Sequence, residues 1–295
     1  MRRIWALWIT MLVATAAAGC AGGDGLGGPG DDPDRLRKQA RDVLARYDEA
    51  VQAAGGQQRY VPVGDLTGQL GDWEPERGEN KASLLSGQVL AGGVLPAAPQ
   101  ATGTVTWDGG ATLDVPLVGA DAALAAIPRS DCGGCPPLTA TGARLTTAKI
   151  STTRGPATVP AWEYTLQDTA VRVTRPAVAA SAAVTVTPPS WDPFNSPGGL
   201  PIDSASVNAA GTTLTLVFTG SPGPASQPCG ADYTGEVVES ANAVVVIILT
   251  HPHAANEACT AIGYRRTLDV DLAAPLGERA LLDIQQGLPM QVTRS

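Results

Sequence analysis

The chain has 295 residues, and its 28 acidic side chains outnumber its 20 basic ones, so the formal net charge is −8. Because phosphate contacts need clustered lysine and arginine, this balance argues against a nucleic-acid-binding protein, and we expect no nucleic acid among its partners. Hydrophobic residues make up 44% of the chain but aromatic residues only 4%, which predicts a core built mainly from aliphatic side chains.

Residues 1–19 have the pattern of an export signal. Two arginines precede an apolar run of fifteen residues, which is shorter than the ~20 that a transmembrane helix needs. The run ends at Ala17-Ala18-Gly19-Cys20, which resembles the lipobox of bacterial lipoproteins. That resemblance implies cleavage before Cys20 and attachment of lipid to its sulfur, which would place the protein on the extracytoplasmic face of the cell membrane. Ordinary secretion with a free or paired Cys20 is the alternative.

Residues 20–32 are rich in glycine and have no apolar periodicity, so we expect a flexible tether there. Cleavage would remove Arg2 and Arg3 from the 20 basic residues, leaving 18 against 28 acidic ones. An anionic bilayer repels such a chain. The acyl chains on Cys20 would therefore have to hold it at the membrane.

The segment 33–60 predicts one amphipathic helix that ends near Ala54. Pro33 suits the first helical position, and Gly55-Gly56 favours termination. Six apolar side chains recur at helical spacing: Leu36, Ala40, Val43, Leu44, Tyr47 and Val51. We expect this stripe to pack on a partner that the pattern leaves open, while the opposite face, whose charges largely offset one another, is solvated.

Beyond residue 60 the pattern changes to strands, and we predict a mainly β protein: two small antiparallel β-sandwich-like modules preceded by the amphipathic helix. The first module spans residues 61–187. It includes a hairpin at 104–117, where Asp108-Gly109 favours a two-residue turn. A short helix at 121–127 is followed by a meander of strands at 139–151, 158–166 and 170–178.

A proline-rich linker at 188–203 divides the β region, because each proline removes a backbone donor. The second module spans 204–295. Its run Val244 to Leu249 is apolar at every position, so we expect a central strand that is covered on both faces. The other strands of this module are predicted at 205–208, 212–219, 233–239, 265–272 and 280–284.

With Cys20 assigned to lipid, four cysteines remain, and disulfides are the default in an exported protein. Three connectivities are open. We favour Cys132 with Cys135 and Cys229 with Cys259, because each pair then lies within one half of the chain.

Two alternative functions arise from these residues and their neighbours. Cys132-Gly133-Gly134-Cys135 has the spacing of a thiol-disulfide exchange motif, but prolines follow it where redox proteins place a helix. His251 and His253 could bind zinc or copper with Glu257 nearby, although a closed site needs more ligands. We therefore expect no cofactor and no metal.

Two loops carry aromatic residues that are candidate binding anchors. Trp73 lies in an acidic stretch, and Trp191 and Phe194 lie in the proline-rich linker. Aromatic side chains are common anchors of protein interfaces. The alternative is that Trp73 has no binding role and lies in an ordinary polar loop, folded back onto the N-terminal helix.

Several stretches of the mature chain have a family likeness: VGDLTGQ (63–69), GDWE (71–74), GARLTT (142–147), RGPATVPAWEY (154–164), YTGEVVES (233–240) and AAPLGERA (273–280). They resemble a family of uncharacterised lipoproteins from high-GC actinobacteria. The resemblance implies an exported lipoprotein and carries no known activity.

The chain has no Gly-x-Ser-x-Gly elbow, no His-Glu-x-x-His and no phosphate-binding loop of the Walker type. We therefore expect a non-enzymatic binding or structural protein of the cell envelope. Its partners would be the membrane, through the lipid anchor, and an envelope protein.

Overall fold

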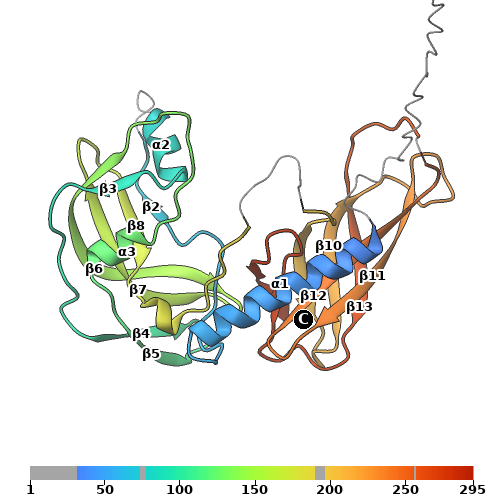
Figure 1. Ribbon diagram of the computed structural model, residues 1–295, viewed down its shortest axis with the longest axis horizontal. Coiled ribbons are helices and arrows are strands. Elements are labelled where there is room, and N and C mark those ends of the chain that lie inside the picture. The colour runs from blue at the N-terminus through green and yellow to red at the C-terminus, as the bar shows by residue number, and fades with distance from the viewer. Residues whose placement is uncertain (1–31, 74–77, 190–196, 256, 295) are drawn as a thin grey trace, which may run out of the picture.

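The computed structural model describes residues 32–73, 78–189, 197–255 and 257–294. The protein is mainly β, as the sequence predicts, and Figure 1 shows two β modules side by side with one long helix lying across the second. The predicted signal segment, Cys20 and the tether up to residue 31 lie outside the described residues, as do Trp191 and Phe194.

The first module is one curved eight-stranded sheet with two short helices, α2 and α3, at one side. Its strand order is β1-β6-β7-β4-β5, with β8 and β2 continuing from β7 and with β3 beside β6. The elements are β1 (Pro62–Val63), β2 (Gly68–Leu70), α2 (Gly78–Leu85), β3 (Val89–Ala91), β4 (Thr102–Trp107), β5 (Thr112–Pro116), α3 (Ala120–Ala125), β6 (Leu138–Thr152), β7 (Ala157–Leu166) and β8 (Arg172–Pro176). The predicted hairpin, short helix and meander are confirmed.

The turn between β4 and β5 differs from the prediction. The backbone N–H of Trp107 donates to the carbonyl of Ala111 at 2.9 Å, and the backbone N–H of Gly110 donates to the carbonyl of Trp107 at 2.8 Å. Gly110 has a φ of 86°, whereas Asp108 and Gly109 do not take positive φ. The connection is therefore a three-residue loop with Gly110 at the left-handed position, and the predicted two-residue Asp108-Gly109 turn is wrong. A second glycine after Asp-Gly lets the left-handed residue move one position along the chain.

The second module consists of two packed four-stranded sheets. One has the order β13-β10-β9-β16 and the other β11-β12-β14-β15. Their bounds are β9 (Ile202–Val207), β10 (Thr213–Gly220), β11 (Ala231–Glu239), β12 (Ala243–Pro252), β13 (Tyr264–Asp271), β14 (Ala280–Leu282), β15 (Pro289–Met290) and β16 (Val292–Arg294). Most ladders are antiparallel, and the short strands β14 and β16 each pair in parallel with a longer neighbour. Strand β9 begins at Ile202, within the stretch predicted as linker.

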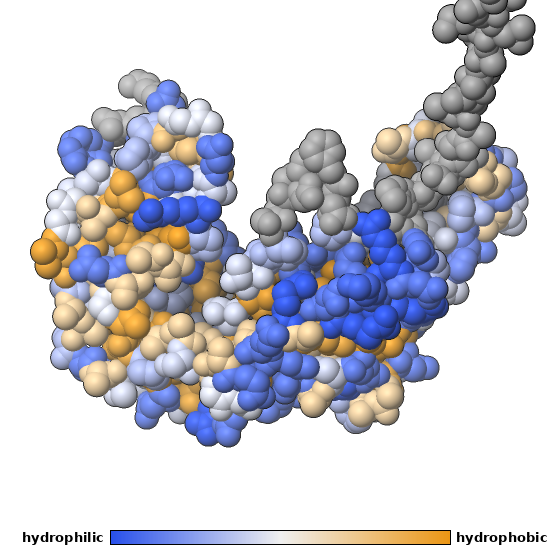
Figure 2. Space-filling model, viewed as in Figure 1, coloured by the Kyte–Doolittle hydropathy of each residue, from blue (hydrophilic) through white to orange (hydrophobic). Residues whose placement is uncertain are grey.

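The helix α1 (Pro33–Ala53) forms as predicted. The carboxylate of Asp32 caps it by accepting the N–H of Asp34 at 3.1 Å. At the other end Gly56, with a φ of 76°, donates to the carbonyl of Val51 at 2.9 Å. The six residues of the predicted stripe are its buried residues. The charged face opposite them forms the hydrophilic surface that Figure 2 shows over α1.

The partner of α1 is the second module, although the first module follows it in sequence. Its stripe packs on Ala243, Val245 and Ile247 of β12. The alternate side chains of β12, Val244 and Val246, face the other sheet together with Ile248. Strand β12 is thus covered on both faces, as predicted, by a helix on one side and a sheet on the other. The second module has three layers.

A bidentate ion pair joins α1 to β11. The guanidinium of Arg37 donates to both carboxylate oxygens of Glu236, at 2.7 Å from Nε and 2.5 Å from Nη2. These hydrogen bonds lower the pKa of Glu236 below its ordinary value. The two residues are 199 positions apart in the sequence, so the pair joins the first helix to a strand of the second module.

Two short segments connect the modules and cross the seam side by side. Val184 donates its N–H to the carbonyl of Tyr60 at 3.0 Å. Tyr60 and Ala183 belong to a core cluster of the first module, whereas Val61 and Val184 belong to the cluster beneath α1. In each connecting segment, one residue is buried in the core of the first module and the next residue is buried in the core beneath α1. This arrangement holds the two modules together.

We predict that replacing Leu36 by alanine lowers the free energy of unfolding by about 2–5 kcal/mol, because the side chain is buried between α1 and β12 and its loss leaves a cavity. Urea unfolding followed by circular dichroism measures the change. Arg41→Ala on the exposed face of the same helix is the matched control, with an expected change within about 0.5 kcal/mol. Equal effects of the two variants would show that α1 is not part of the second core.

Candidate ligand-binding cleft

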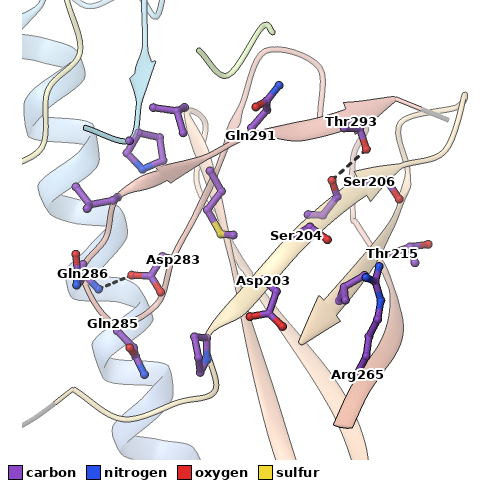
Figure 3. Close-up of a pocket in the computed structure, with 18 residues that line it drawn as sticks. Asp203, Ser204, Ser206, Thr215, Arg265, Asp283, Gln285, Gln286, Gln291 and Thr293 are labelled. Atoms are coloured by element: carbon purple, nitrogen blue, oxygen red, sulfur yellow. Dashed lines mark hydrogen bonds between the residues drawn. The ribbon is translucent and has the colours of Figure 1, made fainter. Parts of the chain in front are cut away.

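A hollow of about 870 Å³ lies on the outer face of the sheet β13-β10-β9-β16, bordered by the first module. Figure 3 shows its lining. The floor has Ser204 and Ser206 of β9 beside Thr215 and the apolar Val217 of β10. Arg265 of β13 and Thr293 of β16 lie at the two edges of the sheet.

The alternation of strand residues explains this floor. Ala205 and Val207 point into the core between the sheets, and so do Leu214 and Leu216 on the neighbouring strand. The residues between them must then face outward, because successive side chains of a strand point to opposite faces. Those residues carry hydroxyl groups, so the sheet has an apolar inner face and a hydroxyl-rich outer face.

A hydrogen-bonded turn after β14 forms one wall of the cleft. Asp283 accepts the N–H of Gln286 at 2.6 Å through its side chain, and Gly287, with a φ of 76°, donates to the carbonyl of Asp283 at 2.9 Å. Gln285 donates its side-chain N–H to the carbonyl of Gly199 at 2.8 Å. These bonds fix the backbone of the turn and the carboxamide of Gln285, while Gln286 lies beside them in Figure 3. Val63 and the adjoining glycine of the first module border the hollow as well.

The lining offers charged and neutral polar groups to a ligand. Charged side chains in it are Asp203, Asp283 and Arg265, and Asp203 accepts a hydrogen bond from Thr219 at 3.2 Å. Hydroxyls and carboxamides offer both donors and acceptors to a polar ligand.

Trp73 does not line this cleft. Its indole N–H donates to the side-chain oxygen of Gln69 at 2.8 Å, and its half-buried ring packs on the core beneath α2 and α3 of the first module. The expectation that Trp73 folds back onto the N-terminal helix is wrong, since α1 belongs to the other module. Its polar atom is satisfied within the module, so the ring contributes to packing.

The two histidines lie near the end of β12 with separate partners. The Nε2 atom of His251 is 2.8 Å from the hydroxyl of Thr234, and the Nδ1 atom of His253 is 2.7 Å from the carbonyl of Ala225. Within the described ranges, neither histidine belongs to a group of three potential metal ligands. Both rings are thus exposed hydrogen-bonding groups, His251 among the last residues of β12 and His253 just after this strand.

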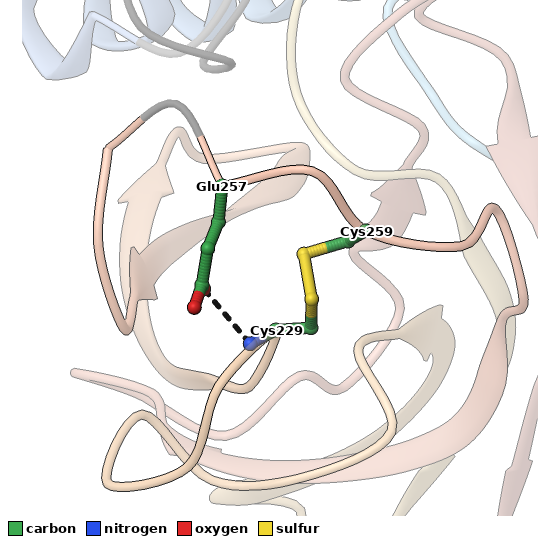
Figure 4. A group of neighbouring side chains, drawn as sticks. All are labelled: Cys229, Glu257 and Cys259. Atoms are coloured by element: carbon green, nitrogen blue, oxygen red, sulfur yellow. Dashed lines mark hydrogen bonds between the residues drawn. A yellow bond between two sulfur atoms is a disulfide. The ribbon is translucent and has the colours of Figure 1, made fainter.

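The structure pairs the cysteines in the way that we favour, Cys132 with Cys135 and Cys229 with Cys259. In Figure 4 the carboxylate of Glu257 lies next to the second disulfide and accepts the backbone N–H of Cys229 at 2.8 Å. This trio has the spacing of a metal site. Because both sulfurs are used in the disulfide, neither is a thiolate, and metal coordination by cysteine requires the thiolate. The carboxylate instead stabilises the loop.

The Cys132–Cys135 disulfide closes a loop between α3 and β6. Gly133 and Gly134 both have positive φ, at 68° and 98°, and the next regular element is the strand β6. A helix following the first cysteine lowers its pKa in dithiol exchange proteins. In this position a strand follows, which favours a structural clip.

Sequence reasoning missed the residues of the cleft. The alternation of apolar and hydroxyl residues in β9 and β10 was a readable signal of a solvated sheet face. The turn at 283–287 and the approach of Val63 come from distant parts of the chain, so no local pattern indicated that this face is walled.

Comparison with family models, with curated proteins and with solved structures found no match to this chain. The likeness to actinobacterial lipoproteins therefore stays a prediction. Among the helices of the described ranges, none combines the length and the apolar character needed to cross a bilayer.

We predict that the two disulfides differ in their contribution to stability. Replacing Cys229 and Cys259 by alanine removes a cross-link with a sequence separation of 30, which should lower the unfolding free energy by about 3–4 kcal/mol on the chain-entropy account. Replacing Cys132 and Cys135, with a separation of 3, should cost about 1–2 kcal/mol. Urea unfolding under oxidising conditions measures both, and equal losses would contradict this ranking.

Proposed function

We propose that the protein is an exported, lipid-anchored binding protein of the cell envelope with no catalytic role. Lipid on Cys20 would hold it at the extracytoplasmic face of the membrane, with residues 20–32 as tether. The two disulfides of the structure support this location, because disulfides persist mainly in oxidising compartments. The expected resemblance to actinobacterial lipoproteins would agree with the same location.

The observation that carries the binding role is the cleft on the outer face of the sheet β13-β10-β9-β16. Its size is within the range of small-molecule sites, and its lining combines hydroxyl and carboxamide groups with apolar side chains such as Val217, Leu288 and Met290. Hydroxyl and carboxamide groups can form hydrogen bonds with the hydroxyl groups of a polysaccharide, and the open face of the sheet suits an extended ligand. We therefore assign to the cleft a segment of neutral envelope polysaccharide.

The anchor is tested by labelling cells with radioactive palmitate. We expect label in the wild-type chain and in Ala21→Ser, and no label in Cys20→Ser, because only the cysteine sulfur can form the thioether to the diacylglyceryl group. Fractionation should find Cys20→Ser outside the membrane pellet. Label that persists in Cys20→Ser, or is missing from the wild type, would contradict the anchor.

The cleft is tested by sedimenting the full-length Cys20→Ser chain with insoluble envelope polysaccharide. Ser204→Trp places a bulky ring on the exposed floor and should reduce the bound fraction at least about tenfold through steric exclusion. Thr267→Trp is the matched control, since Thr267 is an exposed residue of β13 in the same sheet and outside the cleft lining. Equal binding of the two variants, or no binding by the parent chain, would overturn the assignment.

A further inference from the structure

A second hollow lies at the seam between the modules, on the other side of β16. It consists of two adjoining cavities of about 460 and 630 Å³. Both are lined by Arg154, at the tip of the β6–β7 hairpin, and by residues 276–279 of the second module. We call these two cavities together the seam groove. In Figure 1 the β6–β7 hairpin of the first module extends toward the second module at this place.

The seam groove gathers positive charge in an acidic protein. Arg154 and Arg279 line both cavities, Arg294 lines one, and Arg59 lines the other. Glu278 is the carboxylate residue of the lining. The whole chain has a net charge of −8. The net negative charge of the chain repels anions, so attraction of an anion to this groove would depend on the arginines that line it.

One of the four arginines is already neutralised. The guanidinium of Arg279 is paired with the carboxylate of Glu239, and it donates to the carbonyl of Ala274 at 2.6 Å. Glu239 also accepts the N–H of Ala273 at 2.8 Å. Burial raises the pKa of Glu239, but these hydrogen bonds and the charge of Arg279 outweigh it, so the net pKa is lowered and the carboxylate stays ionised. Arg279 therefore shapes the wall of the groove and is not available to a ligand.

Arg154 is held in place by a preorganised turn. The buried hydroxyl of Thr152 accepts hydrogen bonds from the indole N–H of Trp107 at 2.9 Å and from the backbone N–H of Arg154 at 3.1 Å. The same hydroxyl donates to the carbonyl of Gly155 at 2.6 Å. The guanidinium carbon of Arg154 then lies 4.5 Å from the centroid of the Trp107 ring. This stacking orients the guanidinium plane and leaves its N–H groups at the groove.

Arg294 and Arg59 have only neutral partners within the described ranges. Arg294 donates to the carbonyl of Gly277 at 3.0 Å, and Arg59 donates to the side-chain oxygen of Gln57 at 2.5 Å. No carboxylate of the described residues forms an ion pair with Arg59, Arg154 or Arg294. Each guanidinium has five N–H donors, so three arginines retain most of their donors and their full charge.

We propose that the seam groove binds a phosphate-bearing ligand, with Arg154 of the first module and Arg294 of the second as its two principal contacts. Arginine matches phosphate oxygens with two parallel hydrogen bonds, and a ligand with at least two negative charges would neutralise both guanidinium groups. Because the contacts come from both modules, the bound anion would also stabilise their packing at the seam. This site is separate from the polysaccharide cleft.

The test is calorimetric titration of the full-length Cys20→Ser chain with pyrophosphate at low ionic strength. We expect saturable binding to one site and a higher unfolding temperature with ligand, because binding to the native state stabilises it. Arg154→Gln and Arg294→Gln should each weaken binding at least about tenfold, as expected for a lost charge-assisted hydrogen bond. Arg294 takes no part in the stacking on Trp107 or in the turn at Thr152, so its variant remains informative if Arg154→Gln loses stability.

Arg129→Gln is the matched control, because Arg129 is exposed, lies outside the groove and has no ion pair within the described ranges. It should bind pyrophosphate like the parent chain. The cleft variant Ser204→Trp should do so as well, which separates this proposal from the polysaccharide site. Absence of saturable binding, or equal binding by the parent chain and by Arg154→Gln and Arg294→Gln, would overturn the proposal.

A second arm distinguishes the source of the phosphate. Vesicles of phosphatidylglycerol and of phosphatidylcholine are sedimented with the same Cys20→Ser chain. Binding to phosphatidylglycerol that is competed by pyrophosphate and lost in Arg294→Gln would support a lipid headgroup as the ligand. Pyrophosphate binding without vesicle binding would support a soluble phosphate ester. Vesicle binding that persists unchanged in Arg294→Gln would count against the groove.

Discussion

The apolar strand β12 imposes the constraint on which the rest of the architecture depends. Residues 243–248 are all buried, so each face of this strand needs its own cover. The opposing sheet covers one face, and the stripe of α1 covers the other. Neighbouring strands of the same sheet cannot cover either face of β12, because they lie in the plane of the sheet. The N-terminal helix is therefore joined to the C-terminal half of the chain.

This joining makes the first module an insertion between α1 and the strands on which α1 packs. The chain leaves the second module after α1, builds the first module, and returns through residues that lie beside the outgoing segment, as the hydrogen bond from Val184 to Tyr60 shows. Such a path creates a seam, and both hollows border it. The features that suggest binding therefore result from the placement of the modules and are not properties of either sheet alone.

Several parts of the fold could be predicted because their signals are local. The stripe of α1 is visible in the sequence as apolar residues at helical spacing. The meander β6-β7-β8 is visible as segments of alternating apolar and polar residues that turn residues separate. The β4–β5 loop could not be assigned correctly, because Asp108-Gly109-Gly110 is compatible with more than one hairpin loop. Trp73 was misplaced for a different reason: its packing partner depends on which module α1 covers. The cleft and the seam groove were missed because their walls come from residues far apart in sequence.

By itself, the sequence determined the fold class of the protein, the helix with its buried stripe, the positions of most strands and the four cysteines that form the two disulfides. Periodicity, turn residues and composition act over a few neighbouring residues, so these features can be derived without the fold. Only the tertiary structure decided that α1 covers β12, that β14 and β16 pair in parallel, and that Arg154 and Arg294 share one groove. These contacts join segments tens to hundreds of residues apart, and they are selected by which apolar faces can be buried together.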